Sequence, residues 1–307
     1  MRTKIVVGSR GSKLALIQAE LVVAEIRKIN PQVELGISQV VTKGDRDRHA
    51  QLDHMEGIGI FVKELEEALL DSRIDLAVHS LKDVPTEIPQ GLCLLAVTER
   101  LDPSDVLISK SGRLNELPSG ARIGTGSLRR AAQLTQYRSD LKACSIRGNV
   151  DTRLRKVSSG ELDGVILAAA AMIRLGWQDK ISEYLPLEHF VPAVGQGALV
   201  IETRLGDEEI AGLISPLNHL PTWQSITAER AFLSALGGGC RAPIAALGTV
   251  NSDTLKLEGM VADASGREIL RAAEKGSTLF PEKLGIRLAQ RMLETGASEF
   301  IAEVRLK

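Results

Sequence analysis

A cysteine near the end of the chain stands directly after three consecutive glycines. Residues 237–239 are all glycine, Cys240 follows them, and Arg241 comes next. Glycine loses much backbone entropy on folding, so a run of three is kept where positive φ or a close backbone approach is needed. A thiol presented in this way suits a nucleophile or a point of covalent attachment. The alternative is a small buried apolar side chain in a helix-to-strand turn, the commoner place for a free cysteine.

Basic side chains gather between residues 122 and 156. Nine Lys and Arg residues stand against two acidic residues there, a local net charge of +7 in a chain whose formal net charge is -1. This concentration predicts an anion-binding site. Residues 124–130 and 147–153 each lead from a predicted strand end into a predicted helix, where α/β proteins bind ligands. We predict carboxylate contacts for Arg129, Arg130, Arg147 and Arg153, and solvated helix faces for Arg138, Lys142 and Lys156.

A carboxylate follows a predicted buried strand in the first third of the chain. The strand covers residues 75–79, and Lys82, Asp83 and Pro85 come after it. Because residues at the ends of such strands face the ligand crevice, Asp83 is a candidate general acid or an electrostatic partner for a developing cation. A carboxylate that closes an Asx-turn is an equally common use of such an aspartate. His79, within the strand, is predicted to be a core residue.

The start of the chain repeats this arrangement. Residues 3–7 are predicted to form a strand, and Ser12 is predicted to cap the helix that follows. Arg10 and Ser12 therefore stand where a strand ends and a helix begins, a position that favours bound anions.

The elements that must position these groups alternate between apolar runs of strand length and amphipathic runs of helix length. This pattern is typical of an α/β fold with a largely parallel sheet. Residues 43–59 interrupt it and are predicted to form an exposed, mobile loop. Residues 198–203 are predicted to return as a strand to the first sheet. Further predicted strands are 35–41, 92–97, 106–109, 122–124, 141–146 and 164–169, and further predicted helices are 61–70, 128–138 and 150–157.

A third unit follows, with a predicted helix at residues 223–236 that leads into the glycine run. Strands are predicted at residues 244–250, 255–261 and 268–272, and a helix at 281–294. We expect three domains, which comprise residues 1–99 with 198–216, residues 103–193, and residues 220–307.

Composition excludes several classes of protein. A net charge of -1 and 3% aromatic residues argue against a general nucleic-acid binder. Cys93, Cys144 and Cys240 are scattered and have no metal-ligand spacing, so neither a disulfide framework nor a bound metal is expected. No leader segment and no stretch long enough to span a bilayer is present, so we expect a cytoplasmic protein without a membrane partner. We find no Ser-His-Asp set, P-loop or nicotinamide-binding fingerprint.

The motifs, taken in their order along the chain, resemble one family, the porphobilinogen deaminases or hydroxymethylbilane synthases. The resemblance extends over essentially the whole chain. The segments that carry it are residues 8–10, 41–45, 61–66, 79–85, 124–130, 147–153, 192–198 and 239–240.

This resemblance implies an α/β fold of two periplasmic-binding-protein-like domains that flank a cleft, with a smaller C-terminal α+β domain. It implies a transferase that condenses four porphobilinogen molecules head to tail into the linear tetrapyrrole hydroxymethylbilane, with release of ammonia (EC 2.5.1.61). It also implies a dipyrromethane cofactor joined to Cys240 by a thioether, and a monomer without a nucleic-acid partner.

By the same resemblance, Asp83 is the catalytic aspartate, which stabilises the cation formed when porphobilinogen loses ammonia. Because substrate and cofactor carry acetate and propionate groups, the arginine and hydroxyl side chains are assigned to carboxylate binding. Residues assigned to the cofactor are Lys82, Thr125, Ser127, Arg129, Arg130 and Arg147, and those assigned to the substrate are Arg10, Ser12, Arg153, Arg174 and Gln196.

The sequence departs from the family pattern at two places. Residues 54–59 lack two lysines that the family usually carries, and Gly126 stands where a serine is common. Without those lysines, the loop at 43–59 is expected to act more by excluding water than by binding carboxylates.

Two alternatives without catalysis stay open on the residues alone. One is an anion-binding module with the same two-lobed fold, since fold does not fix function. The other is a redox-regulated binding protein with Cys240 as its sensor. The first gives no purpose to Asp83 or to a cysteine that follows glycines, and the intact mass of the purified protein separates both alternatives from an enzyme that carries an added dipyrrole.

Overall fold

The computed structural model describes residues 4–40, 62–237 and 242–305. Its backbone contacts divide the chain into two compact units. The division into three domains with the boundaries given above stays a prediction. Unit 1 consists of Met1–Leu101 and Ala198–Trp223, and unit 2 consists of Asp102–Gly197 and Gln224–Lys307.

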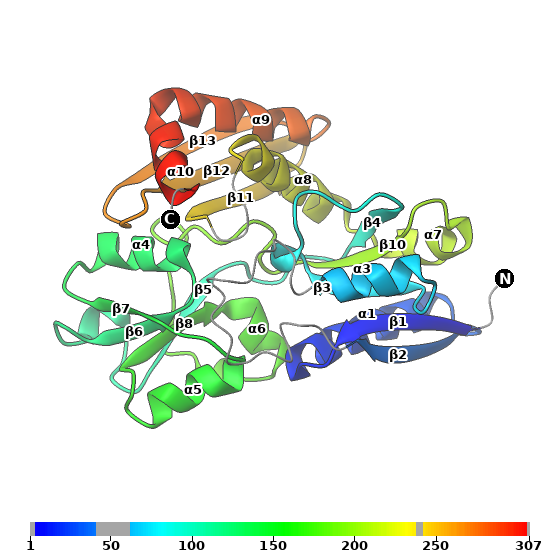
Figure 1. Ribbon diagram of the computed structural model, residues 1–307, viewed down its shortest axis with the longest axis horizontal. Helices are drawn as coiled ribbons and strands as arrows, with labels where there is room; N and C mark the ends of the chain where they lie inside the picture. Colours follow the sequence, from blue (N-terminus) through cyan, green and yellow to red (C-terminus); the bar gives the residue numbers. More distant parts are fainter. Residues whose placement is uncertain (1–3, 41–61, 238–241, 306–307) are drawn as a thin grey trace. The chain divides into compact units, whose positions relative to one another are not determined.

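Unit 1 is built on a five-stranded mixed sheet with the order β2-β1-β3-β10-β4 (Figure 1). β1 pairs in parallel with β2 and β3, whereas β10 runs antiparallel to β3 and β4. The predicted return of residues 198–203 to the first sheet is confirmed by β10. The sheet is largely parallel, as predicted, since β1, β2, β3 and β4 run in one direction and the returning strand β10 runs in the opposite one. The strands are β1 (Lys4–Arg10), β2 (Glu34–Val40), β3 (Leu76–Ser80), β4 (Leu92–Val97) and β10 (Leu199–Arg204).

Helices cover both faces of this sheet. α1 (Lys13–Ile29) packs Val22 and Ile26 against the face that carries Val7, and α7 (Glu208–Ile214) joins the same cluster. α3 (Lys63–Leu70) packs Leu65 and Leu69 against the other face, which carries Ala77. Alternate residues of β1 and β3 therefore enter different apolar clusters, as the two-residue period of a strand requires.

The first sheet of unit 2 also mixes strand directions. Its order is β7-β6-β8-β5-β9, with β6 parallel to β7 and β8, and β5 antiparallel to β8 and β9. α4 (Leu128–Tyr137) covers one face, while α5 (Val150–Ser158) and α6 (Ala169–Arg174) cover the other. The strands are β5 (Asp105–Ser109), β6 (Arg122–Thr125), β7 (Lys142–Ser145), β8 (Gly164–Ala168) and β9 (Glu183–Tyr184).

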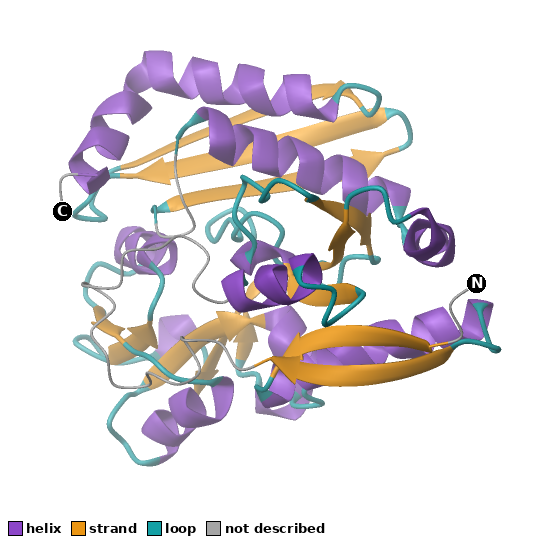
Figure 2. Ribbon diagram, turned by 45° about the vertical axis from the view of Figure 1, so that its right-hand side comes forward, coloured by secondary structure: helices purple, strands orange, loops and turns teal. Residues whose placement is uncertain are grey.

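The second sheet of unit 2 has three antiparallel strands, β11 (Ile244–Asn251), β12 (Thr254–Ala262) and β13 (Ile269–Ser277). α8 (Leu220–Ala235) and α9 (Pro281–Met292) pack on it through a cluster that includes Phe232 and Leu288 (Figure 2). A second cluster joins Ala245 and Met260 to Ala132 of α4. Helix α4 therefore packs against the three-stranded sheet as well as against its own.

Short elements complete the described part of the chain. The sequence predicted neither α6 nor α7, nor the final helix α10 (Ser298–Arg305). Among the described residues, no helix combines the length and the apolar content that crossing a bilayer requires. The same residues contain no group of three His, Cys, Asp or Glu side chains placed to hold a metal ion. The short helical turns are η2 (Leu81–Asp83), η3 (Leu114–Glu116), η4 (Gln178–Lys180), η5 (Ser215–Leu217) and the π-turn η6 (Leu293–Ala297).

Candidate active site

The first group of predicted site residues lies at one edge of the unit 1 sheet. β1 ends at Arg10 and β3 ends at Ser80, and these neighbouring strands run in parallel. Their carboxyl ends therefore meet the same edge, where Ser12 follows one strand and Lys82 and Asp83 follow the other. The expected placement of these residues just beyond strand ends is confirmed.

Ser12 caps helix α1. Its Oγ accepts a hydrogen bond from the backbone N–H of Ala15 at 3.3 Å, which confirms the predicted cap. A serine hydroxyl that accepts through a lone pair keeps its own proton to donate. Ser12 can therefore hold the start of the helix and donate to a ligand carboxylate at the same time.

Asp83 ends the short turn η2, which follows β3 directly. Leu81 and Val84 are both buried on either side of it. The Leu81 N–H donates to the Ala198 carbonyl, and the Val84 N–H donates to the Leu81 carbonyl, so the turn is closed by backbone groups. The side chain of Asp83 is exposed. The fold thus fixes the backbone of this residue and leaves its carboxylate open to a ligand.

Three predicted binding residues of unit 2 converge on a carboxylate that sequence reasoning did not single out. Asp105, the first residue of β5, is fully buried. Its Oδ2 accepts from Arg129 Nη1 at 2.7 Å, and its Oδ1 accepts from Arg130 Nη2 at 2.7 Å and from Gln196 Nε2 at 2.8 Å. The three donors are themselves at most 6% exposed. These four residues are called the Asp105 cluster below.

The charges of the Asp105 cluster do not cancel. Burial by itself raises the pKa of Asp105, but the charges and hydrogen bonds of Arg129 and Arg130 outweigh it and hold that pKa below its ordinary value. One carboxylate against two guanidiniums leaves one positive charge in the first turn of α4. An anion at this helix start would balance it. Direct ligand contact by Arg129 and Arg130 stays a prediction, and the structure adds that each already has an internal partner.

The turn between β6 and α4 carries two predicted hydroxyl donors. Thr125 is buried, and its Oγ1 accepts from the backbone N–H of Ser127 at 3.2 Å. Ser127 occupies the N-cap position of α4 without a side-chain capping bond. At Gly126 between them, a Cβ atom would lie 2.7 Å from the carbonyl oxygen of Ile146. The glycine at this departure from the family pattern therefore permits a close approach of two backbone segments.

The remaining predicted arginines differ in their surroundings. Arg147 is exposed just after β7, and Arg153 donates from Nε to the Gly148 carbonyl at 2.8 Å. Arg174 donates from Nη2 to the Gly197 carbonyl at 2.8 Å, while its buried Nε has no partner among the described residues. Burial lowers the pKa of Arg174 to about 10. A buried donor without a partner is a position that an anionic ligand would satisfy.

Two further residues, which the sequence did not point to, hold the chain segment that contains Gln196. Glu229 of α8 is fully buried and accepts from the backbone N–H groups of Gly195 at 2.7 Å and Gly248 at 2.8 Å. Gln133 of α4 both accepts from and donates to the backbone of Val191. The sequence offered no separate signal for these two residues, because α4 and α8 each carry further polar side chains.

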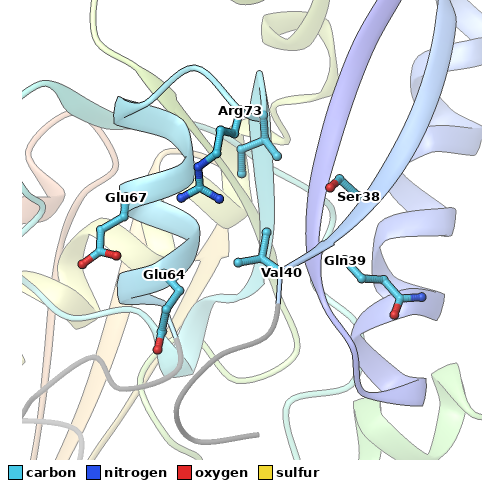
Figure 3. A pocket seen from close by; sticks show the side chains of 7 residues that line it. Ser38, Gln39, Val40, Glu64, Glu67 and Arg73 are labelled. Atoms are coloured by element: carbon cyan, nitrogen blue, oxygen red, sulfur yellow. The ribbon is translucent and has the colours of Figure 1, made fainter. Parts of the chain in front are cut away.

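A pocket of about 330 Å³ lies elsewhere in unit 1, between β2 and α3 (Figure 3). Glu64 and Glu67 of α3 line it together with Arg73, which pairs with Asp71 at 3.4 Å. None of the predicted site residues is among the described residues that line this pocket. It is therefore a feature apart from the predicted site.

Two predictions fall on parts of the chain that are not described. Cys240 and the loop at residues 43–59 both lie outside the described residues. The assignment of the cofactor to Cys240 and the role given to the loop thus rest on the sequence.

Comparisons with known proteins agree along the whole chain. Residues 5–212 match the family model described as porphobilinogen deaminase, dipyromethane cofactor binding domain, and residues 223–294 match porphobilinogen deaminase, C-terminal domain. The porphobilinogen deaminase of Geobacter metallireducens is 50% identical over 298 residues, which cover 97% of this chain and 94% of that protein. That of Desulforudis audaxviator is 48% identical over 306 residues, which cover 99% of both.

Among solved structures, the chain is similar to the periplasmic aliphatic sulphonate binding protein SsuA from Escherichia coli. The two are 12% identical, the match covers 76% of this chain and 71% of that one, and the TM-score is 0.41. The curated relatives are far closer in sequence. From their identity over nearly the full length, the chain belongs to the porphobilinogen deaminase family, the dipyrromethane-dependent deaminases of tetrapyrrole biosynthesis (EC 2.5.1.61).

Proposed function

We propose that Asp83 is the catalytic carboxylate of this porphobilinogen deaminase and that Cys240 carries its dipyrromethane cofactor. The observation that best supports the first part is the exposed carboxylate of Asp83 on a turn with buried neighbours. The end of β1, which carries Arg10 and leads to Ser12, lies at the same sheet edge. A substrate with acetate and propionate groups would meet cationic and hydroxyl donors beside the reactive carboxylate.

Asp83 supports the reaction through charge and proton transfer. Loss of ammonia from porphobilinogen leaves positive charge on the substrate pyrrole, and a nearby carboxylate lowers the energy of that charge. The same carboxylate oxygens can accept a proton from the pyrrole and return it. A fixed backbone keeps this carboxylate in place through repeated additions.

The donors of unit 2 fit a cofactor that carries several carboxylates. Ser127 Oγ makes no capping bond, and Arg147 is exposed. When bound, the cofactor supplies the primer to which substrate units are added. The residues proposed to hold its carboxylates are Lys82, Thr125, Ser127, Arg129, Arg130 and Arg147, and those proposed for the substrate are Arg10, Ser12, Arg153, Arg174 and Gln196.

Replacement of the carboxylate tests the role of Asp83. We expect Asp83→Asn to keep the cofactor but to lose nearly all turnover, measured as ammonia and tetrapyrrole release. Glu87→Gln, which removes another exposed carboxylate of the same segment, is the matched control and should keep normal turnover. Near-normal turnover by Asp83→Asn refutes the proposed role.

Intact mass spectrometry tests the role of Cys240. The wild-type protein should carry the added mass of a dipyrrole, and Cys240→Ser should have the mass of the bare chain. Cys144→Ser is the control, because Cys144 is a free thiol of unit 2 and should not affect the adduct. Fully active wild-type protein with the bare mass would contradict the assignment.

We also propose that the enzyme acts in the cytoplasm as a monomer, as the family resemblance implies. Light scattering on the purified enzyme should give the mass of one chain across its working concentration range. A concentration-independent mass of two chains would contradict the proposed assembly state.

A further inference from the structure

Two strands of unit 1 place a histidine and a glutamate on the same face of the sheet. In the antiparallel pair β3 and β10, His79 is opposite Val200 and Glu202 is opposite Ala77. Diagonal neighbours of this kind are within reach of long side chains. His79 Nε2 and Glu202 Oε2 lie 3.0 Å apart, which closes a hydrogen bond across the strands.

A second glutamate approaches this pair from α3. Ala77, which alternates with His79 along β3, packs in the same cluster as Leu65 and Leu69 of α3. His79 therefore lies on the face that α3 covers. Glu66 of that helix is 8% exposed, and its electrostatic partners include Glu202 and His79. We call Glu66, His79 and Glu202 the Glu66 cluster.

The Glu66 cluster is nearly sealed from water, and its two carboxylates outnumber its single imidazole. His79 is 4% exposed and Glu202 is 0% exposed. Glu202 Oε1 is buried and has no hydrogen-bond partner among the described residues. A buried carboxylate oxygen without a donor is unfavourable, so the environment favours a further proton in the cluster.

The surroundings of Glu66 also favour its protonated form. Burial and the charge of Glu202 raise the pKa of Glu66 from 4.5 to about 7, with a smaller rise from Glu67, while His79 and Lys63 oppose that rise. Lys63 and Glu67 are exposed residues of α3 itself. From β4, the residue opposite Glu202 is the apolar Leu94. Arg204 of β10 lies two residues beyond Glu202, and its guanidinium pairs with Asp75 and Asp207.

The cluster lies just before the turn that carries Asp83. His79 is followed by Ser80, which ends β3, and η2 begins at the next residue. Gln18 of α1 donates to Ser80 Oγ at 2.8 Å on the other side of the sheet. The end of β3 is thus held on one face by α1 and on the other by the His79–Glu202 hydrogen bond.

We propose that Glu66 holds an ionisable proton beside the His79–Glu202 hydrogen bond and that the three residues act as positioning residues for the turn that carries Asp83, an inference that rests on the proposed role of Asp83. With Glu66 protonated, its side chain adds no charge to the cluster. Loss of the Glu66 proton leaves a negative charge beside Glu202. Repulsion then loosens α3 from β3 and β10 and displaces the end of β3. Turnover falls as a result, while the donors that bind substrate are unchanged.

Glu66→Gln tests the ionisation of Glu66, because it copies the shape of the protonated side chain and cannot ionise. Thermal unfolding of the holoenzyme is measured from about pH 5 to about pH 8.5 in the wild type, in Glu66→Gln and in Glu67→Gln, the exposed neighbour on α3. The variant and the wild type should unfold at similar temperatures at the acidic end. Glu66→Gln should become increasingly more stable than the wild type as pH rises, and Glu67→Gln should follow the wild type.

The pH profile of turnover tests the coupling to Asp83. We expect kcat of the wild type to fall relative to Glu66→Gln by about threefold between about pH 6 and about pH 8.5, the scale of a small displacement of a catalytic group. KM for porphobilinogen should be the same in both proteins. Glu67→Gln should keep the wild-type profile.

Each outcome has a separate meaning. If the unfolding temperatures of the wild type and of Glu66→Gln change with pH in the same way, the proposed ionisation of Glu66 is wrong. If the unfolding temperatures of the two proteins diverge with pH but their kcat profiles are identical, the proposed coupling of the cluster to turnover is wrong. Turnover that persists in Asp83→Asn overturns the proposed function instead, and it leaves the unfolding result of the Glu66 cluster intact.

Discussion

Two buried clusters of charged side chains, one in each unit, behave in opposite ways although both exclude water. In the Asp105 cluster, one carboxylate meets two guanidiniums, and its pKa is held below the ordinary value. In the Glu66 cluster, two carboxylates share one histidine, and the pKa of Glu66 rises to about 7. Burial alone raises the pKa of a carboxyl group. The balance of neighbouring charges therefore decides the direction in each unit.

The two clusters also differ in how completely their hydrogen bonds are formed. Both oxygens of Asp105 accept bonds, whereas Oε1 of Glu202 has no partner in the described part of the chain. A fully bonded polar network rigidifies its surroundings, and an incomplete one responds to protonation. We infer that the first cluster is a fixed support for the start of α4 and that the second is sensitive to pH.

The largest effect is expected when the Asp105 cluster loses its carboxylate. Asp105→Asn leaves Arg129 and Arg130 buried without a counter-charge, which should cost about 3–5 kcal/mol of unfolding free energy. Urea unfolding followed by fluorescence measures this loss, with soluble yield as a second readout. An unchanged urea midpoint in well-folded Asp105→Asn would show that the two guanidiniums do not depend on Asp105.

The next largest effect is expected from Arg271→Ala, which tests whether the Asp105 cluster is linked to the C-terminal sheet. Arg129 donates to the Val191 carbonyl, Gln133 bonds the same residue, and Arg271 of β13 donates to the carbonyls of Glu188 and His189. Arg271→Ala should lower the unfolding free energy of unit 2 by about 2 kcal/mol, because it removes a charged donor that makes three hydrogen bonds to this segment and to Gln133.

Arg287→Ala is the matched control for this link. Arg287 pairs with Glu274 at 2.8 Å and is about half exposed, so its removal should cost under about 1 kcal/mol. Equal losses in the two variants would mean that the Arg271 contacts are no more important than a surface ion pair.

The pH dependence of the unfolding free energy distinguishes the two clusters. The folded-state pKa of Glu66 exceeds its ordinary value. The contribution of Glu66 to stability is therefore greatest below pH 4.5 and declines as the pH rises to about 7. After allowance for partial solvent access, we expect a decline of about 1–2 kcal/mol that Glu66→Gln lacks. Asp105 has the opposite shift, so its contribution is lost only in strong acid, and the penalty of Asp105→Asn should be equal at about pH 5.5 and about pH 8.

The smallest effect is expected at an exposed ion pair. Lys28 and Glu25 of α1 lie 2.6 Å apart, and both are more than half exposed. Glu25→Gln should change the unfolding free energy by less than about 0.5 kcal/mol, and added salt should remove that difference. A loss comparable to that of Asp105→Asn would remove the distinction between buried and exposed charges on which the comparison depends.

Much of the local structure could be predicted from the sequence. The predicted strand at 92–97 coincides with β4, and Ser12 caps α1 as expected. The helix predicted at 128–138 is α4, which ends one residue earlier. These features depend on periodicity and on capping groups a few residues apart, so the information is present in a short stretch of chain.

The partners of the buried charges could not be predicted in the same way. Arg129 and Arg130 were assigned to ligand carboxylates from their place at a helix start, and the structure supplies Asp105 as an internal partner. Asp105 gave no signal, since an acid at the beginning of an apolar strand usually belongs to a turn. Likewise His79 was expected in the core, which is confirmed, but its glutamate partner was not foreseen.

The sequence by itself determined the family, the order of most strands and long helices, and the residues that stand at strand ends, because these follow from motifs and from neighbours along the chain. Only the tertiary structure decided which charges share a buried site. His79 and Glu202 are 123 positions apart, and Asp105 and Gln196 are 91 apart. Their contacts form because β10 returns to the first sheet and because the segment with Gln196 folds back onto β5. Whether a buried carboxyl group holds or releases its proton depends on these distant neighbours, since electrostatic energy is set by separation in space.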